Sequence, residues 1–191
     1  MMELEQAIAT RRTIRRFAQS PVLEGDLRAV ADAGRLAASA GNRQPCRFLA
    51  ISRPELVERM HENVAWLAGM GPPPGAEPVA YMVILADSAA NRNYVSDCAA
   101  AAENMLLAAH GRGIGSCWIG SVNRDALRDL LGIPAGLEIY AVIALGYPAE
   151  QAVAGDAEEN APLTVTRSRE GTVRVPKRRL DDILRFERWE G

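Results

Sequence analysis

The stretch from Asn91 to His110 is the longest helical pattern in the chain, and it limits the possible folds most strongly. Its section CAAAAENMLLAAHG is rich in alanine, the residue with the highest helix propensity. Small side chains let other elements approach a helix closely on several sides, so we expect this helix at the centre of the structure. Gly111 and Gly113 follow directly and predict its end.

Three apolar runs predict buried strands: CRFLAIS (46–52), VAYMVILA (79–86) and LEIYAVIALGYP (137–148). Helical spacing and breaker residues predict further helices at 3–10, 24–38, 53–67, 123–131 and in LDDILRF. Residues 151–162 are predicted to be a loose loop and 172–176 an edge strand. Strands and helices mix without a regular β-α-β order, so the pattern indicates an α+β fold, in one domain spanning residues 1–191.

The overall charge disfavours one class of function. The chain has 22 Lys and Arg against 24 Asp and Glu, a net charge of −2. A general nucleic-acid-binding protein is normally basic, so we expect no nucleic-acid partner. Hydrophobic residues make up 48%, which predicts a packed core rather than disorder.

Cysteine usage and the apolar runs indicate the compartment. Cys46, Cys98 and Cys117 show no metal-ligand spacing, and their odd number disfavours a disulfide framework. The N-terminus carries acidic residues where a signal peptide would be apolar. No apolar run approaches the length needed to cross a membrane. We therefore expect a cytoplasmic protein without a membrane partner.

The segment ATRRTIRRF (9–17) holds four arginines within six residues. In an extended chain alternate side chains share a face, which groups Arg11, Thr13 and Arg15 on one side. Two guanidinium groups flanking a hydroxyl offer charge-assisted donors to a phosphate. A solvated run of charge is the alternative, and the segment alone does not decide between them.

A polar loop, SAGNRQP (39–45), separates a predicted helix from a predicted strand. Ser39, Asn42 and Gln44 offer both donors and acceptors, as a planar heterocycle with mixed polar edges requires. A helix C-cap followed by a turn explains the same residues, and turn chemistry alone favours that simpler interpretation.

The glycine-rich segment GRGIGSCWIG (111–120) is not a nucleotide-binding motif. It follows a long helix rather than a strand, and its spacing is not that of the dinucleotide fingerprint. It also lacks the Gly-Lys-Ser/Thr of a P-loop. Ile119 and Gly120 can instead present backbone N–H groups to a flat ligand, whereas Trp118 is predicted to be a core residue.

A second basic cluster, PKRRL (176–180), lies near the C-terminus. Alone it is typical of a solvated patch. Two small basic clusters at opposite ends of a slightly acidic chain can, however, converge on one anion.

The sequence contains no recognisable acid–base or metal apparatus. His61 and His110 show no metal-ligand spacing, and no nucleophile elbow is present. Asp97 and Glu103 lie six residues apart on the central helix, so they do not face each other. We therefore predict no catalytic side chain and no metal ligand. If the chain is an enzyme, a bound cofactor carries the chemistry.

In this order, the motifs resemble those of the nitroreductase family of FMN-dependent oxidoreductases, over nearly the whole chain. RRTIRRF followed by PV is similar to the family's Arg-x-Ser-x-Arg/Lys phosphate motif, and AASAGNRQP to its Pro-Ser-Ala-x-Asn-x-Gln-Pro loop. DCAAAAENMLLAAHGRGIGSCWIG resembles its central helix and glycine turn. LLGIP, ALGYP and PKRRLDDILRFERW resemble its later landmarks. Each motif is weak alone, but six in the right order are specific.

The resemblance implies a fold, a cofactor and a set of ligands. The fold would be an α/β sandwich of the α+β class, with a central, mostly antiparallel sheet flanked by helices. It would form an intertwined homodimer with exchanged C-terminal segments and FMN at the interface. The implied cofactor-binding residues are Arg11, Arg12, Thr13, Arg15, Ser39, Asn42, Gln44, Ile119, Gly120, Lys177 and Arg179.

Within this set the resemblance assigns different parts of FMN to different residues. Arg11 and Thr13 would hold the phosphate and ribityl chain, together with Lys177 and Arg179. Arg15 would lie near the ribityl chain or the N1–O2 edge of the ring. The polar loop would contact the flavin, partly from the other subunit, and Ile119–Gly120 would face flavin N5.

The implied reaction is ping-pong. NADH or NADPH would pass a hydride to flavin N5, and a nitroaromatic, a quinone or a related electron-poor acceptor would then be reduced. Alternatives are dehydrogenation or dehalogenation of a special metabolite on the same fold, or a flavin-binding module without catalysis.

Three departures from the family pattern stand out. Ala38 replaces a common proline, Cys46 replaces a common aromatic residue, and residues 63–78 are short for a substrate lid. The short segment suggests an open pocket.

Overall fold

The computed structural model describes residues 2–67 and 69–189, which divide into two compact units. Met1–Ala149 is called the N-terminal unit and Glu150–Gly191 the C-terminal unit. The expected single domain over residues 1–191 therefore stays a prediction.

An antiparallel sheet forms the core of the N-terminal unit. Strand β3 pairs with β2 on one side and with β5 on the other, and the far edge of β5 pairs with β4 and β1. The strands are β1 (Phe17–Ala18), β2 (Cys46–Ile51), β3 (Ala80–Asp87), β4 (Gly115–Ile119) and β5 (Leu137–Pro148). The three apolar runs are β2, β3 and β5, which confirms them as strands.

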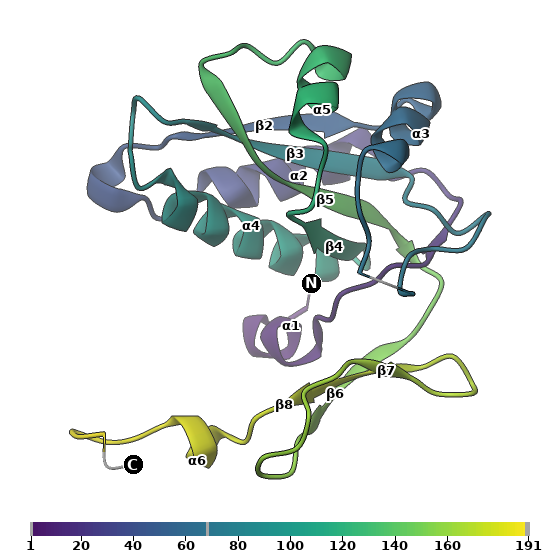
Figure 1. Cartoon of the computed structure of the whole chain (residues 1–191), viewed down its shortest axis with the longest axis vertical. Coiled ribbons are helices and arrows are strands. Elements are labelled where there is room, and N and C mark those ends of the chain that lie inside the picture. Colours follow the sequence, from purple (N-terminus) through teal and green to yellow (C-terminus); the bar gives the residue numbers. More distant parts are fainter. Residues whose placement is uncertain (1, 68, 190–191) are drawn as a thin grey trace. The chain divides into compact units, whose positions relative to one another are not determined.

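Helices cover both faces of this sheet, and Figure 1 shows α2 and α4 on one face with α3 and α5 on the other. Successive side chains of a strand point to opposite faces, so β3 is buried on both. Its Met82 and Ile84 pack in the cluster formed with α2 and α4. Tyr81 hydrogen-bonds His61 of α3 on the other face. The helices are α1 (Leu4–Thr10), α2 (Glu24–Arg35), α3 (Pro54–Glu62), α4 (Tyr94–His110) and α5 (Arg124–Leu131). The α+β fold with a flanked antiparallel sheet is confirmed.

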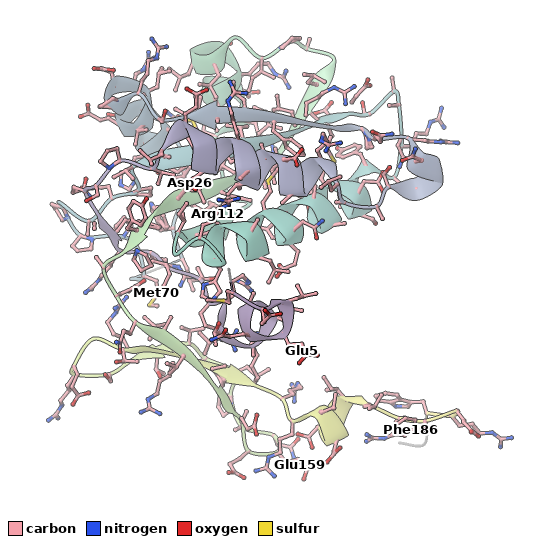
Figure 2. The ribbon with its side chains drawn as sticks, turned by 180° about the vertical axis from the view of Figure 1, so that it is seen from behind. Glu5, Asp26, Met70, Arg112, Glu159 and Phe186 are labelled. Atoms are coloured by element: carbon pink, nitrogen blue, oxygen red, sulfur yellow. The ribbon has the colours of Figure 1, made fainter. Side chains whose placement is uncertain are left out.

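Helix α4 is the alanine-rich helix, and it lies at the centre of the N-terminal unit as expected. It packs against α1, α2 and strands β2 to β5. Cys98, Ala102, Met105 and Ala109 are fully buried along it. The turn after α4 is tied to α2 by an ion pair of Arg112 with Asp26, whose nearest atoms are 3.3 Å apart (Figure 2).

Two helix boundaries test the capping predictions in this unit. Helix α5 begins as predicted, since the Asn123 side chain accepts a hydrogen bond from the Ala126 N–H. Helix α3 was predicted to run to Leu67, which is wrong because it ends at Glu62. The chain then leaves the helix to pair Val64 with Val122.

A small three-stranded sheet organises the C-terminal unit. Its order is β6 (Ala152–Asp156), β8 (Val173–Lys177) and β7 (Thr166–Arg167), followed by helix α6 (Leu180–Ile183). The loose loop predicted at 151–162 is wrong, because β6 lies within it. The predicted edge strand is β8, which is the middle strand and not an edge. Both errors concern partners distant in sequence, which local patterns do not report.

Candidate flavin site

The arginine stretch is extended, as predicted, and runs beside strand β4. Thr13 pairs with Ser116 in a parallel bridge, and the Ile14 N–H donates to the Ser116 carbonyl at 2.9 Å. Ile14 is buried directly against Gly115, where a Cβ would lie 2.9 Å from the Ile14 side chain. Backbone pairing and close packing thus fix the stretch next to the glycine turn that follows α4.

The arginine side chains leave unsatisfied donors here. Arg11 pairs with Glu103 of α4, with 3.3 Å between Nε and Oε1. Arg12 donates to the carbonyl groups of Ala9 and Arg11, and burial together with the charge of Arg11 lowers its pKa. The Nε atoms of Arg12 and Arg16 are buried without a hydrogen-bond partner among the described residues. Concentrated positive charge with spare donors favours an anion at this place.

Arg15 and the Ile119–Gly120 turn line the same pocket, of about 360 Å³. That volume lies within the range of about 300–1,000 Å³ typical of small-molecule sites. A Cβ on Gly120 would meet no atom within 4 Å, so the turn faces open space rather than packed protein. Trp118 also lines the pocket while packing against Tyr140, and is therefore only in part the core residue predicted.

Trp66 lines this pocket too, although the motifs did not predict it. The Ala65 N–H donates to the Ser121 carbonyl at 2.8 Å, and this bond brings the segment after α3 against the glycine turn. The Trp66 indole Nε1 is buried and has no hydrogen-bond partner in the described part of the chain. The only signal was a tryptophan shortly before the turn-rich segment GMGPPPG, which the incorrect extension of α3 concealed.

The polar loop has an internally bonded, strained backbone. The Ser39 Oγ accepts from the Gln44 N–H at 3.0 Å, and the Gln44 side-chain amide donates to Asn42 Oδ1 at 3.2 Å. Asn42 and Gln44 have φ values of +53° and +46°. A left-handed conformation costs a residue other than glycine about 1–2 kcal/mol. Such strain persists where surrounding contacts enforce it, and it concentrates at functional sites.

Asp97 of α4 supplies the enforcing contact. Its Oδ1 accepts from the Ala40 N–H at 3.0 Å, and its Oδ2 accepts from the Asn91 side chain at 2.6 Å. Asp97 and Asn91 are 5% and 4% exposed. From the sequence, Asp97 was a candidate only for acid–base chemistry. The missed signal was a carboxylate directly before the apolar run CAAAA, where it requires buried partners.

The predicted flavin residues of the N-terminal unit therefore form two groups at different places along α4, since Arg11 pairs with Glu103 in the middle of the helix. The polar loop is attached to Asp97 near the start of the helix, whereas α1 reaches its end through the 2.8 Å contact of Thr10 with His110 (Figure 1). At 1.5 Å per residue, Asp97 and His110 are about 20 Å apart along the helix. Ser39 and Gln44 line a separate hollow of about 150 Å³.

The second basic cluster lies in the C-terminal unit. Lys177 ends β8, and Arg179 immediately precedes α6. Arg179 pairs with Glu158, with 3.0 Å between Nη2 and Oε2. The convergence of this cluster with the arginine stretch on one phosphate stays a prediction.

The described residues form no cluster of metal ligands. Among residues 2–67 and 69–189, no group of three or more His, Cys, Asp or Glu side chains could hold a metal ion. No helix in these ranges is long and apolar enough to cross a membrane. A separate hollow of about 520 Å³, lined in part by His61 and Glu77, contains none of the predicted flavin residues.

Comparison with known protein families shows which family this chain belongs to. The model of the nitroreductase family matches residues 8–147. The chain belongs to the nitroreductase family. A relative from Archaeoglobus fulgidus, with the provisional name NADH dehydrogenase/NAD(P)H nitroreductase, is 38% identical over 79% of this chain and 88% of its own.

Solved structures of nitroreductases agree with this assignment. A protein of Desulfovibrio desulfuricans, provisionally named a nitroreductase and solved in complex with FMN, superposes with a TM-score of 0.70 at 27% identity. The match covers 100% of this chain and 99% of that one. A protein of Clostridium acetobutylicum, provisionally named an NADH oxidase, has a TM-score of 0.71 at 24% identity and shares the fold. The match to that chain covers 96% of this one and 99% of the other.

Proposed function

We propose that this nitroreductase-family chain is an FMN-dependent NAD(P)H oxidoreductase. The observation that carries the proposal is the pocket shared by Arg15 and the Ile119–Gly120 turn. It lies beside a cationic stretch with spare donors, so an anionic group and a flat ring have adjoining places. The FMN-bound relative from D. desulfuricans supports the choice of cofactor. We also propose a cytoplasmic location, on the sequence alone.

The residues present fit FMN. Arg11 and Thr13 would hold the phosphate and ribityl chain, with Arg12 completing the local positive charge. Arg15 would place a guanidinium at the ring, where fixed positive charge stabilises negative charge that develops during reduction. Ile119 and Gly120 would offer backbone groups to the ring edge, and Ser39, Asn42 and Gln44 would contribute the polar contacts.

When bound, FMN would supply the redox chemistry of a ping-pong reaction: hydride transfer from NADH or NADPH through N5, followed by reduction of an acceptor. The protein's part is to bind, orient and exclude water. Trp66 and Trp118 in the pocket wall favour a planar, electron-poor acceptor such as a nitroaromatic or a quinone.

We further propose that the site is completed in a homodimer. The two groups of flavin residues contact α4 at different places and line separate hollows, so a second chain would have to bring one group to the other. The C-terminal unit also needs a partner surface, because only Ala157 and Val173 of its described residues are buried. Its Phe186 and Trp189 are 82% and 71% exposed. Lys177 and Arg179 would reach the phosphate from this exchanged segment.

A visible absorption spectrum tests the proposal. Purified protein should show a flavin spectrum that bleaches on anaerobic addition of NADH or NADPH. A flavin that neither donor bleaches would support a binding module without catalysis. Protein that is colourless and does not take up added FMN would overturn the proposal.

Arg11→Ala tests the phosphate contact directly. Loss of one charge-assisted bond should weaken FMN binding roughly tenfold or more, since such bonds are worth about 1.5–3 kcal/mol. Arg28→Ala is the matched control, because Arg28 is an exposed arginine paired with Glu24 on α2. Equal FMN affinity in the two variants would contradict the assigned role of Arg11.

A further inference from the structure

Two of the three cysteines lie against each other beside the polar loop. The Sγ atoms of Cys46 and Cys98 are 3.4 Å apart, although the residues are 52 positions apart in sequence. Cys46 is the first residue of β2 and is partly exposed, whereas Cys98 lies in α4 and is fully buried. Cys117, the third cysteine, is on β4 and takes no part in this contact.

The two thiols differ chemically. The hydrogen bond from Cys98 lowers the pKa of Cys46, although burial and the charge of Asp97 oppose this, and the charge of Arg47 adds a smaller lowering. The bond to Cys46 and burial raise the pKa of Cys98. Of the two, the accessible thiol of Cys46 is therefore the one that loses its proton more readily, and the thiolate is the reactive species. The buried Cys98 thiol lies next to it.

We propose that Cys46 and Cys98 form an oxidation site that hydrogen peroxide converts to an intramolecular disulfide. The Cys46 sulfur attacks the peroxide, the O–O bond breaks, and Cys46 becomes a sulfenic acid with release of water. The Cys98 sulfur then attacks Cys46, the S–O bond breaks, and its oxygen leaves as a second water. Two thiols and hydrogen peroxide thus give one disulfide and two waters, with two electrons passing from the sulfurs to the peroxide.

The geometry requires little movement for this step. A disulfide bond is about 2.05 Å long, so the sulfurs must approach by about 1.4 Å from the observed 3.4 Å. Rotation of two side chains and a small backbone shift can supply that change.

The site is coupled to the polar loop at both ends. Cys46 follows Gln44 and Pro45 directly. Cys98 follows Asp97, whose carboxylate accepts a hydrogen bond from the Ala40 N–H. Drawing Cys46 toward α4 shifts one end of the loop while Asp97 fixes the other. Oxidation is therefore expected to disturb Ser39, Asn42 and Gln44 and to weaken FMN binding severalfold. This second expectation rests on the proposed function, whereas disulfide formation does not.

Thiol counting on the full-length protein, as purified, tests the proposal. Freshly reduced protein should present three thiols on denaturation and, after treatment with stoichiometric hydrogen peroxide, one. The intact mass should fall by two hydrogens, and peptide mapping should join the Cys46 and Cys98 peptides. A count that stays at three, a gain of oxygen at Cys46 without a link, or a cross-link between two chains would each overturn the proposal.

Two variants make the assignment specific. Cys117→Ala should still lose two thiols under peroxide, whereas Cys46→Ser should form no intramolecular disulfide. FMN affinity is then measured for the reduced and oxidised protein and for Cys46→Ser with and without peroxide. A peroxide-dependent loss in the native chain but not in Cys46→Ser supports the coupling. Equal FMN affinity of the reduced and the oxidised native chain overturns the coupling to the loop. Protein that forms the disulfide but binds no FMN in either form instead contradicts the proposed function.

Discussion

The arginine stretch and the polar loop are positioned by different means. The stretch is held by backbone pairing with β4 and by the buried side chain of Ile14 against Gly115. The loop has exposed residues and positive φ angles, and its main attachment to the helix is the buried carboxylate of Asp97. Packing fixes the first region and a few polar bonds fix the second. Single polar substitutions should therefore affect the loop far more than the stretch.

The largest effect is expected from Asp97→Ala, which removes the attachment of the loop. The Asn91 amide and the Ala40 N–H lose their acceptor, and an unsatisfied buried donor costs about 1–3 kcal/mol. The free energy of unfolding should fall by about this amount and FMN affinity should fall with it. Thermal denaturation and flavin titration measure both.

Asp129→Ala is the control for this change, because Asp129 is an exposed carboxylate on α5. If Asp97→Ala behaved like Asp129→Ala, the loop would not depend on this carboxylate, and the contrast between the two regions would fail.

The arginine stretch should instead be sensitive to volume. Gly115→Ala places a Cβ about 2.9 Å from the Ile14 side chain, so either β4 or the stretch must shift. Overpacking of this kind typically costs about 1–3 kcal/mol. Gly136→Ala adds the same methyl group where no atom lies within 4 Å, and it should be nearly neutral. Denaturant unfolding of the pair compares the two, and equal stability would show that packing does not fix the stretch.

The strain in the loop predicts an opposite change in stability and function. Gln44→Gly relieves a left-handed residue, so the free energy of unfolding should rise by up to about 1 kcal/mol. FMN affinity should fall because the side-chain contact is lost. Arg43→Gly is the neighbouring control: Arg43 has φ −76°, so glycine there brings only its entropic cost of about 0.5–1 kcal/mol. A loss of stability in both variants would remove the argument for strain.

The sequence predicted the parts of the structure that local pattern controls. The three apolar runs predicted the buried strands, the alanine content predicted α4, and the Asn123 cap predicted the start of α5. The pairing of β6 with β8 and of residues 63–65 with 121–123 was missed, because these contacts join segments far apart in the chain. Motif order gave the family, but it did not reveal that Asp97 supports the loop or that Trp66 lines the pocket. Both roles depend on which element packs against the residue in the folded chain. The type of a single residue does not contain that information.

The smallest effect is expected at His110, where the arginine stretch meets the end of α4. Thr10 donates its single hydroxyl hydrogen to the Gln6 carbonyl at 2.6 Å, so His110 Nε2 must donate to the Thr10 Oγ across their 2.8 Å contact. Burial and then the charges of Arg11 and Arg12 lower the pKa of His110. The unfolded chain therefore binds the proton more readily than the folded one.

Stability linked to His110 should be fully present above the ordinary histidine pKa of about 6.5 and lost as pH falls through the lower, folded value. His110→Gln keeps a donor for Thr10 but cannot titrate, so its melting temperature should decline less between about pH 7 and 5 than that of the native chain. Asp129→Ala is the control, because it keeps His110 and should therefore retain the native slope in this interval. If the melting temperatures of native protein and His110→Gln declined equally with pH, the positive charge of the arginine stretch would not affect the protonation of His110. The arginine stretch and the polar loop would then differ in packing alone.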